Sequence, residues 1–413
     1  MKPLIRRLAG FSGLPLLAMV TPFLLLPIVA RLLGVEGWSS FAVGQTVGVF
    51  ASTAIMVGWH VSGPARLALA TNSTQRAELY DQALWSRILI ATLILPVAIT
   101  ITALLSRPSH VADAVLMTIA MSLLGLTPAW YCIGLGSSRL LAVYETAPRL
   151  VATVVSALLL ALTGQVWIYP LLLIAASVGA LVAFSARVVR APRNHPTLRA
   201  LVRALCHQAP LAASNVVGAL YTATPVPIAV ALSSQGASAA FASAERLYRF
   251  SRFTITSTAN AFQSWVLEPD ATRPRRRQLA VIGTHSLLGL AGAIALALLG
   301  PWATGILFGR ALAASTGACV YFGAAFLFSS VATPLIRNLI VPTGRARQVL
   351  VATTFGAAVG VPLMFVLHSA IGTEGVAAAL AISELIVLMF LVRPAVSAFT
   401  RLVEKSPSEW TIS

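Results

Sequence analysis

Four charged residues lie within one short stretch that is otherwise apolar or small, and they are Glu245, Arg246, Arg249 and Arg252. On a helix the spacing of three keeps successive arginines within about 60° of one another, so the three cover one face. Glu245 precedes Arg249 by four residues and can pair with it. The guanidinium fork binds two oxygens at once and keeps its proton, which suits phosphate. The pattern predicts a cationic site for a phosphate-bearing anion.

The composition indicates where this site lies. Of 413 residues, 58% are hydrophobic and 10% are charged, whereas soluble domains average about 45–50% and 25%. A soluble enzyme, a coiled coil and a disordered chain are excluded. In a soluble protein, the net charge of +17 would suggest a nucleic-acid partner. In a membrane protein, positive charges first indicate which loops are cytoplasmic, so no nucleic-acid partner is expected.

Twelve stretches are apolar and long enough to span a bilayer, which takes about 20 residues each. Six tryptophans near their ends predict an aromatic belt at the headgroups, namely Trp38, Trp59, Trp85, Trp167, Trp265 and Trp302. The predicted spans are 9–31, 39–60, 86–106, 113–135, 145–163, 166–186, 207–232, 238–266, 279–307, 312–336, 348–369 and 373–392.

The basic residues sort by loop. With the N-terminus in the cytoplasm, 23 of the 29 lysines and arginines lie on the cytoplasmic side, three on the outer side and three inside a span. The positive-inside rule therefore predicts a multi-pass protein with both termini in the cytoplasm. No loop exceeds about 25 residues, too short for a soluble catalytic domain.

Two echoes indicate an internal repeat. Residues 40–45 (SFAVGQ) resemble residues 240–245 (AFASAE), and the Thr-Pro, Gly-x-x-Arg pattern at 127–139 recurs at 333–347. We predict two six-helix halves, residues 1–195 and 196–413, which enclose a central cavity and operate by alternating access. The predicted fold class is an all-α membrane protein with about 12 transmembrane helices.

The arginines of the 238–266 span need polar surroundings. Arg249 lies eleven residues beyond Ser238, about 16 Å along a helix and hence near mid-bilayer. Three arginines facing lipid would cost on the order of 8–10 kcal/mol. One interpretation is a cationic substrate cavity. The alternative is that they pair with Glu384, Glu145 or backbone carbonyls and only lock the helices together.

Other residues are weaker candidates. Gln45 and Asn215 could bind substrate, although an interhelical hydrogen bond is the more common role of such residues. Arg31 could line a cavity mouth or extend to the interface, and Glu384 could bind a coupling H⁺ or Na⁺ or form a salt bridge. The three cysteines and six histidines are scattered, so we expect no catalytic residues, no metal site and no cofactor.

Motifs along the whole chain resemble those of the Wzx-type polysaccharide flippases of the multidrug/oligosaccharidyl-lipid/polysaccharide exporter superfamily. The first two spans, from Pro22 to Ala70, are similar to the start of that family. The segments 127–136 (TPAWYCIGLG), 242–249 (ASAERLYR) and 375–384 (GVAAALAISE) resemble three further signatures. Two departures are an absent acidic residue in the seventh span and Ala-Ala-Phe at 239–241 in place of Gly-x-Tyr.

The resemblance implies a V-shaped 6+6 bundle in the bacterial inner membrane. The substrate would be an oligosaccharide on undecaprenyl pyrophosphate, moved from the cytoplasmic to the outer leaflet. Membrane lipids, a coupling ion and the glycosyltransferase and polymerase machinery would be its partners. The protein is then a transporter and not an enzyme.

Two alternatives remain open. A drug/cation antiporter of the same superfamily would need an acidic or aromatic cavity, opposite in sign to three arginines. A membrane-embedded polymerase or glycosyltransferase would need acids and histidines grouped at one membrane face, and the six histidines show no such grouping.

Overall fold

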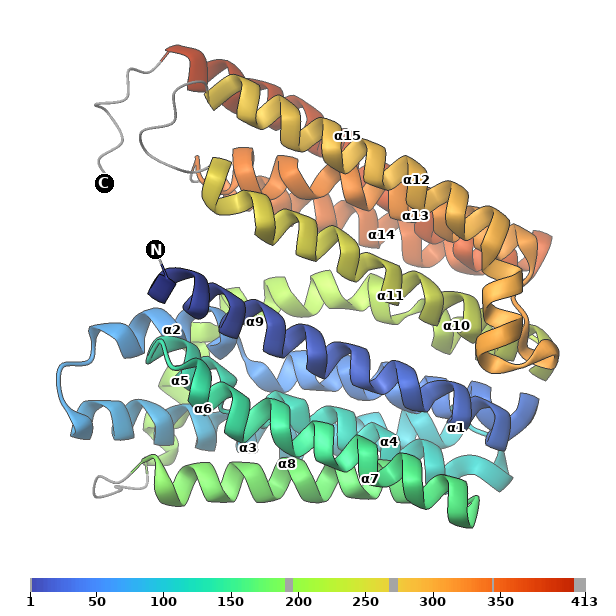
Figure 1. The fold of residues 1–413 in the computed structure, drawn as a ribbon, viewed down its shortest axis with the longest axis horizontal. Coiled ribbons are helices and arrows are strands. Elements are labelled where there is room, and N and C mark those ends of the chain that lie inside the picture. Colours follow the sequence, from blue (N-terminus) through green and yellow to red (C-terminus); the bar gives the residue numbers. More distant parts are fainter. Residues whose placement is uncertain (1, 190–195, 267–273, 344, 405–413) are drawn as a thin grey trace. The chain divides into compact units, whose positions relative to one another are not determined.

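The computed structural model describes residues 2–189, 196–266, 274–343 and 345–404, and within these ranges it is helical without a strand (Figure 1). The prediction of an all-α fold is confirmed. The chain divides into two compact units, Met1–Ala219 and Leu220–Ser413. The division predicted from sequence, after residue 195, falls at a residue outside the described ranges.

The first unit consists of α1 to α8 and most of α9. Its helices are α1 (Lys2–Met56), α2 (Trp59–Leu69), α3 (Ser73–Leu105), α4 (Val111–Ser122), α5 (Ala129–Gly134), α6 (Ser138–Leu141), α7 (Ala147–Thr163), α8 (Ile168–Arg187) and α9 (Leu198–Ala223). Short 3-10 helices η1 (Pro108–His110) and η2 (Leu123–Leu126) and the π-helix η3 (Ala142–Thr146) connect them.

The second unit consists of the end of α9 and the helices that follow it. These are α10 (Pro225–Leu232), α11 (Gln235–Val266), α12 (Pro274–Phe308), α13 (Thr316–Pro334), α14 (Ala346–Ile371) and α15 (Thr373–Glu404). The 3-10 helix η4 (Arg310–Leu312) follows α12, and the π-helix η5 (Leu335–Ile340) extends α13. Within this unit α12 packs against α13, and both α13 and α14 pack against α15.

The first predicted span and most of the second lie in the single helix α1, which is broken at Gly34. This residue has φ 60° and ψ −160°, a conformation outside the helical region. Glycine adopts a positive φ readily because it has no Cβ. The break at Gly34 falls between the predicted spans 9–31 and 39–60, so it turns one continuous helix into two segments.

Nine helical segments among the described residues are long and apolar enough to cross a membrane. Three predicted spans are not among the nine. The first, 9–31, belongs mostly to the part of α1 whose side chains are not described. The seventh is interrupted between α9 and α10, and the eighth carries the four charges of residues 245–252. All three are helical in the structure.

An aromatic cluster forms the core at one end of the first unit. The rings of Trp59 and Trp130 are 5.6 Å apart, and Tyr131 lies edge-on to Trp130. The buried Arg87 donates to the carbonyls of Gly125 and Thr127, at 3.2 and 2.9 Å. These bonds satisfy carbonyls at the irregular η2 segment, where helical partners are missing.

The aromatic belt predicted from sequence is wrong for two of its members. Trp38 and Trp59 are 0% and 1% exposed, so they pack in the core of the first unit. Trp85, Trp167 and Trp302 are exposed, as a belt requires. The Trp265 side chain lies outside the described residues. Position near a span end does not distinguish a lipid-facing ring from one that faces a neighbouring helix.

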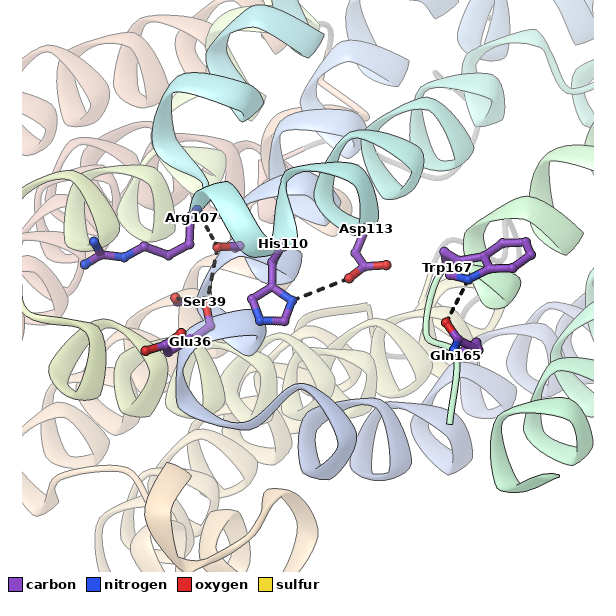
Figure 2. A network of polar contacts seen from close by, with 8 residues as sticks. Glu36, Ser39, Arg107, His110, Asp113, Gln165 and Trp167 are labelled. Carbon is purple, nitrogen blue, oxygen red and sulfur yellow. Dashed lines mark hydrogen bonds and ion pairs between the residues drawn. The ribbon is translucent and has the colours of Figure 1, made fainter. Parts of the chain in front are cut away.

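Polar contacts hold together the corner where α1, η1 and α4 meet (Figure 2). The backbone N–H of Arg107 donates to Ser40 Oγ at 3.0 Å, and His110 Nδ1 lies 3.5 Å from Asp113 Oδ2. The Arg107 side chain points away from His110 and Asp113 (Figure 2). A methyl group on Gly37 would come within 2.9 Å of the His110 ring, so the imidazole packs directly on the α1 backbone.

Gly44 allows α1 and α4 to pack closely, and this gives a first testable prediction. A Cβ at this position would lie 2.2 Å from the backbone oxygen of Ala114, so Gly44→Ala should push the two helices apart and cost about 1–3 kcal/mol. The matched control is Gly179→Ala in α8, where a Cβ meets open space. The control should be neutral or slightly stabilising. Thermal unfolding in detergent compares the two, and equal midpoints would refute the packing argument.

Candidate functional site

The candidate site is built on α11 in the second unit. The first half of this helix is rich in alanine, a strong helix former, and the charged residues follow directly after it. Glu245 and Arg246 are buried, at 2% and 4% exposure. Arg249 and Arg252 are intermediate. The exposure of the charged side chains therefore increases along the helix, from the buried Glu245 and Arg246 to the partly exposed Arg249 and Arg252.

A break between α9 and α10 supplies a backbone acceptor for this site. Pro225 and Pro227 cannot donate backbone hydrogen bonds, so α9 ends at Ala223 and its last carbonyls are left for other donors. Arg249 Nη2 donates to the carbonyl oxygen of Thr222 at 3.0 Å. A cation at the C-terminal end of a helix is favourable because the helix dipole is negative there.

Glu245 holds the other side of the same arginine. The Arg249 Nε–H donates to Glu245 Oε1 in an ion pair that spans one helical turn. The Arg249 side chain is 25% exposed and the Glu245 side chain 3%. Glu245 Oε2 has no hydrogen-bond partner among the described residues. The pair predicted from the spacing of four is thus present, and it orients the guanidinium.

Tyr248 lies at the centre of the charged residues. Its ring stacks on Phe322 of α13 at 5.1 Å, and Arg252 lies over the ring with its guanidinium carbon 5.8 Å from the centroid. Its hydroxyl is buried and has no hydrogen-bond partner in the described part of the chain. The charged groups of Glu245 and Glu384 are close enough to influence it electrostatically.

These residues line a small pocket, which we call the Arg249 pocket. Its volume is about 110 Å³, enough for several water molecules or one phosphate group and too little for an oligosaccharide. Two of its lining side chains are cationic and one is anionic. The lining residues are Thr222, Glu245, Tyr248, Arg249, Arg252 and Leu380.

Several residues predicted for the site are not among those that line the Arg249 pocket. Arg246 is buried and does not line the Arg249 pocket. Arg31 and Gln45 are on α1, and Asn215 is on the part of α9 that belongs to the first unit. Arg31 is exposed, and Gln45 and Asn215 are partly buried. Gln45 Oε1 and Asn215 Nδ2 have no hydrogen-bond partner among the described residues, so both remain candidates for binding.

The acidic candidates differ in their surroundings. Glu384 lies on α15, is 3% exposed and is within electrostatic reach of Tyr248. Glu145, one possible partner for the arginines, instead pairs with Arg149 in its own unit and accepts a hydrogen bond from Thr127. In the described ranges no group of three or more His, Cys, Asp or Glu is arranged to hold a metal.

The sequence did not identify Tyr248 or Thr222 as members of the site. Tyr248 precedes Arg252 by four residues, a spacing that brings an aromatic ring under a cation on a helix. That signal was available in the sequence. The Thr222 carbonyl had no comparable signal, because it depends on where α9 ends.

Solved structures show which class of fold this is. An inward-facing multidrug resistance MATE family transporter of the MOP superfamily matches with a TM-score of 0.64 and 14% identity, over 95% of this chain and 99% of that one. The lipid II flippase MurJ in an inward closed conformation matches with a TM-score of 0.67 and 12% identity, over 98% and 93%. The MATE transporter VcmN of Vibrio cholerae matches with a TM-score of 0.53 and 14% identity, over 98% of each chain. The fold is that of MOP superfamily membrane transporters.

The family model described as polysaccharide biosynthesis protein matches residues 10–262. The chain therefore belongs to this family, and the resemblance seen in the sequence motifs is confirmed. No curated protein matches the chain in sequence. It is a multi-pass membrane protein of the polysaccharide biosynthesis family, with several helices long and apolar enough to cross a membrane.

Proposed function

We propose that this protein moves an undecaprenyl-pyrophosphate-linked oligosaccharide from the cytoplasmic to the outer leaflet. Membership in the polysaccharide biosynthesis family and a fold shared with the lipid II flippase MurJ support a lipid-linked substrate. The observation that carries the proposal is the Arg249 pocket, where one arginine is oriented by Glu245 and the Thr222 carbonyl and a second lies over Tyr248. This arrangement suits a phosphate group.

The size of the Arg249 pocket limits which part of the substrate can bind inside it. A volume of about 110 Å³ is enough for a phosphate and too small to enclose the sugars. In the proposed mechanism the pyrophosphate is held at Arg249 and Arg252, the lipid tail stays in the bilayer, and the two halves rock to expose the site on alternate sides. Arg246, Gln45, Asn215 and Arg31 are proposed as further contacts of the substrate, and Glu384 as the site of a coupling H⁺ or Na⁺.

The sign of the charge separates this proposal from drug/cation antiport. A cationic drug would meet Arg249 and Arg252 at the Arg249 pocket, against one carboxylate that already pairs with Arg249. Deletion of the gene should cause lipid-linked oligosaccharide to accumulate on the cytoplasmic side of the inner membrane. If the deletion leaves surface polysaccharide unchanged and overexpression gives drug resistance, the antiporter alternative is favoured.

Tyr248 provides a prediction that separates folding from binding. Its hydroxyl is buried without a protein partner among the described residues, so Tyr248→Phe should leave the midpoint of thermal unfolding unchanged or raise it slightly. If the hydroxyl donates to the bound pyrophosphate, the same variant should weaken binding of the lipid diphosphate about tenfold. Tyr144→Phe, on the first unit's π-helix, is the matched control. Unchanged affinity in Tyr248→Phe would remove this residue from the site.

A further inference from the structure

The polar face of α11 does not end at the Arg249 pocket. At 100° per residue, Arg249, Arg252, Thr256 and Asn260 share one face of the helix. Thr256 and Asn260 are exposed. Asn260 lies eleven residues beyond Arg249, about 16 Å along the helix. The face therefore runs from the pocket toward the end of α11 that is predicted to be cytoplasmic.

A second arginine meets this face at its far end. Arg337 Nη1 donates to Asn260 Oδ1 at 2.8 Å. Arg337 belongs to the π-helix η5, which follows α13. Its partner is a neutral amide, so the contact fixes the guanidinium on the α11 face without cancelling its charge. Residues 335–350 contain no Asp or Glu.

The first unit offers a contrast. There the arginine just after the π-helix η3, Arg149, is paired with the carboxylate of Glu145. The charge of Arg149 is therefore compensated by a carboxylate four residues before it. Arg337 instead contacts the neutral side chain of Asn260, so its positive charge is not compensated by this contact and can attract an anion.

A buried glutamine holds η5 in place. Gln278 of α12 is 3% exposed, and its Nε2 donates to the backbone oxygen of Asn338 at 3.2 Å. A π-helix departs from the usual i to i−4 bonding and is frequently found at functional sites. The bond from Gln278 therefore holds the backbone of the residue next to Arg337.

We propose that Arg337 and Asn260 form a second anion-binding site, which we call the Arg337–Asn260 site, and that it receives the diphosphate headgroup before the Arg249 pocket does. This inference rests on the proposed function. A rim charge acts mainly on the rate of association and on its salt dependence, whereas a buried contact acts mainly on dissociation. The two sites therefore have distinct kinetic signatures.

The test uses the full-length protein in nanodiscs of phosphatidylcholine, with undecaprenyl diphosphate as the probe. Association and dissociation rates are measured over a range of NaCl concentrations for wild type, Arg337→Gln, Asn260→Asp and the control Arg347→Gln. Asn260→Asp keeps the shape of the side chain and the arginine, but it supplies a carboxylate that neutralises Arg337. Arg347 is exposed at the start of α14. Its replacement by glutamine removes the same charge outside the Arg337–Asn260 site.

Both Arg337→Gln and Asn260→Asp should lower the association rate constant about tenfold at low salt and flatten its salt dependence. Arg347→Gln should change it less than twofold. Arg249→Gln should instead raise the dissociation rate. The inference is overturned if Arg337→Gln and Arg347→Gln behave alike, or if the effect of Arg337→Gln appears only when phosphatidylglycerol is added, which would assign Arg337 to leaflet lipids.

The same experiment separates this inference from the proposed function. If wild type does not bind undecaprenyl diphosphate, or if Arg249→Gln leaves its affinity unchanged, the proposed function fails and the Arg337–Asn260 site fails with it. If Arg249→Gln weakens binding and neither Arg337→Gln nor Asn260→Asp alters association, only the Arg337–Asn260 site is refuted. The thermal unfolding midpoint of each variant is measured as well, to check that the variant is folded.

Discussion

Arg249→Gln should lower the transport rate roughly 10- to 100-fold. In a deletion strain, this variant should therefore restore correspondingly less surface polysaccharide than wild type. The arginine is oriented by Glu245 and by the Thr222 carbonyl, and a charge-assisted hydrogen bond to a phosphate is worth about 1.5–3 kcal/mol. Glutamine keeps a polar side chain of intermediate length but removes the charge. The measurement is the amount of surface polysaccharide formed per unit of folded protein in the membrane.

The control for this variant is Arg276→Gln. Arg276 is exposed at the start of α12 and carries the same charge outside the Arg249 pocket. It should restore polysaccharide almost fully. Full restoration by Arg249→Gln at normal expression would mean that the arginine only locks the helices together, which is the structural alternative that the sequence left open.

The second large effect is expected on stability, from Glu245→Ala. Glu245 is buried and its carboxylate pairs with Arg249, while Arg246 lies next to it with 4% exposure. Loss of one partner of a buried ion pair costs about 3–5 kcal/mol. The Arg249 side chain is 25% exposed, so solvent screening reduces the expected loss to about 2–3 kcal/mol.

Thermal unfolding in detergent measures this loss, with Glu245→Gln as the control. The amide keeps an oxygen that can accept from Arg249 Nε, so its cost should be about half or less. In a double-mutant cycle, Glu245→Ala and Arg249→Gln should couple by about 1–2 kcal/mol. Additive effects would show that the pair contributes nothing to folding, and the carboxylate would then need another explanation.

Much of the fold follows from composition and charge. The helical class, the position of α11 and the pairing of Glu245 with Arg249 all derive from short-range spacing, which a helix turns into fixed geometry. Of the three predicted spans that are not among the nine candidates, the seventh is interrupted between α9 and α10 and the eighth carries charges, and the first lies mostly where side chains are not described. In the eighth span, three of the four charged residues that weaken the hydropathy signal line the Arg249 pocket, namely Glu245, Arg249 and Arg252.

The rest of the site depends on where helices end. The Thr222 carbonyl is available to Arg249 because α9 ends at Ala223. In the sequence, Arg337 counts only as one of the basic residues on the cytoplasmic side. Its contact with Asn260 could not be predicted because the two residues are 77 positions apart. Trp59 was assigned to the membrane interface and lies in the core instead. Contacts of this kind are long-range, and hydropathy and spacing do not encode them.

The central claim is tested most directly by reconstitution. The purified protein is placed in proteoliposomes with a fluorescent undecaprenyl-pyrophosphate-linked oligosaccharide in both leaflets, and the fraction accessible to a membrane-impermeant quencher is followed. We predict that wild type brings the inner-leaflet pool to the outer leaflet and that Arg249→Gln does so at least tenfold more slowly. Equal rates for wild type, Arg249→Gln and protein-free vesicles would contradict the claim that this protein is a lipid-linked oligosaccharide flippase.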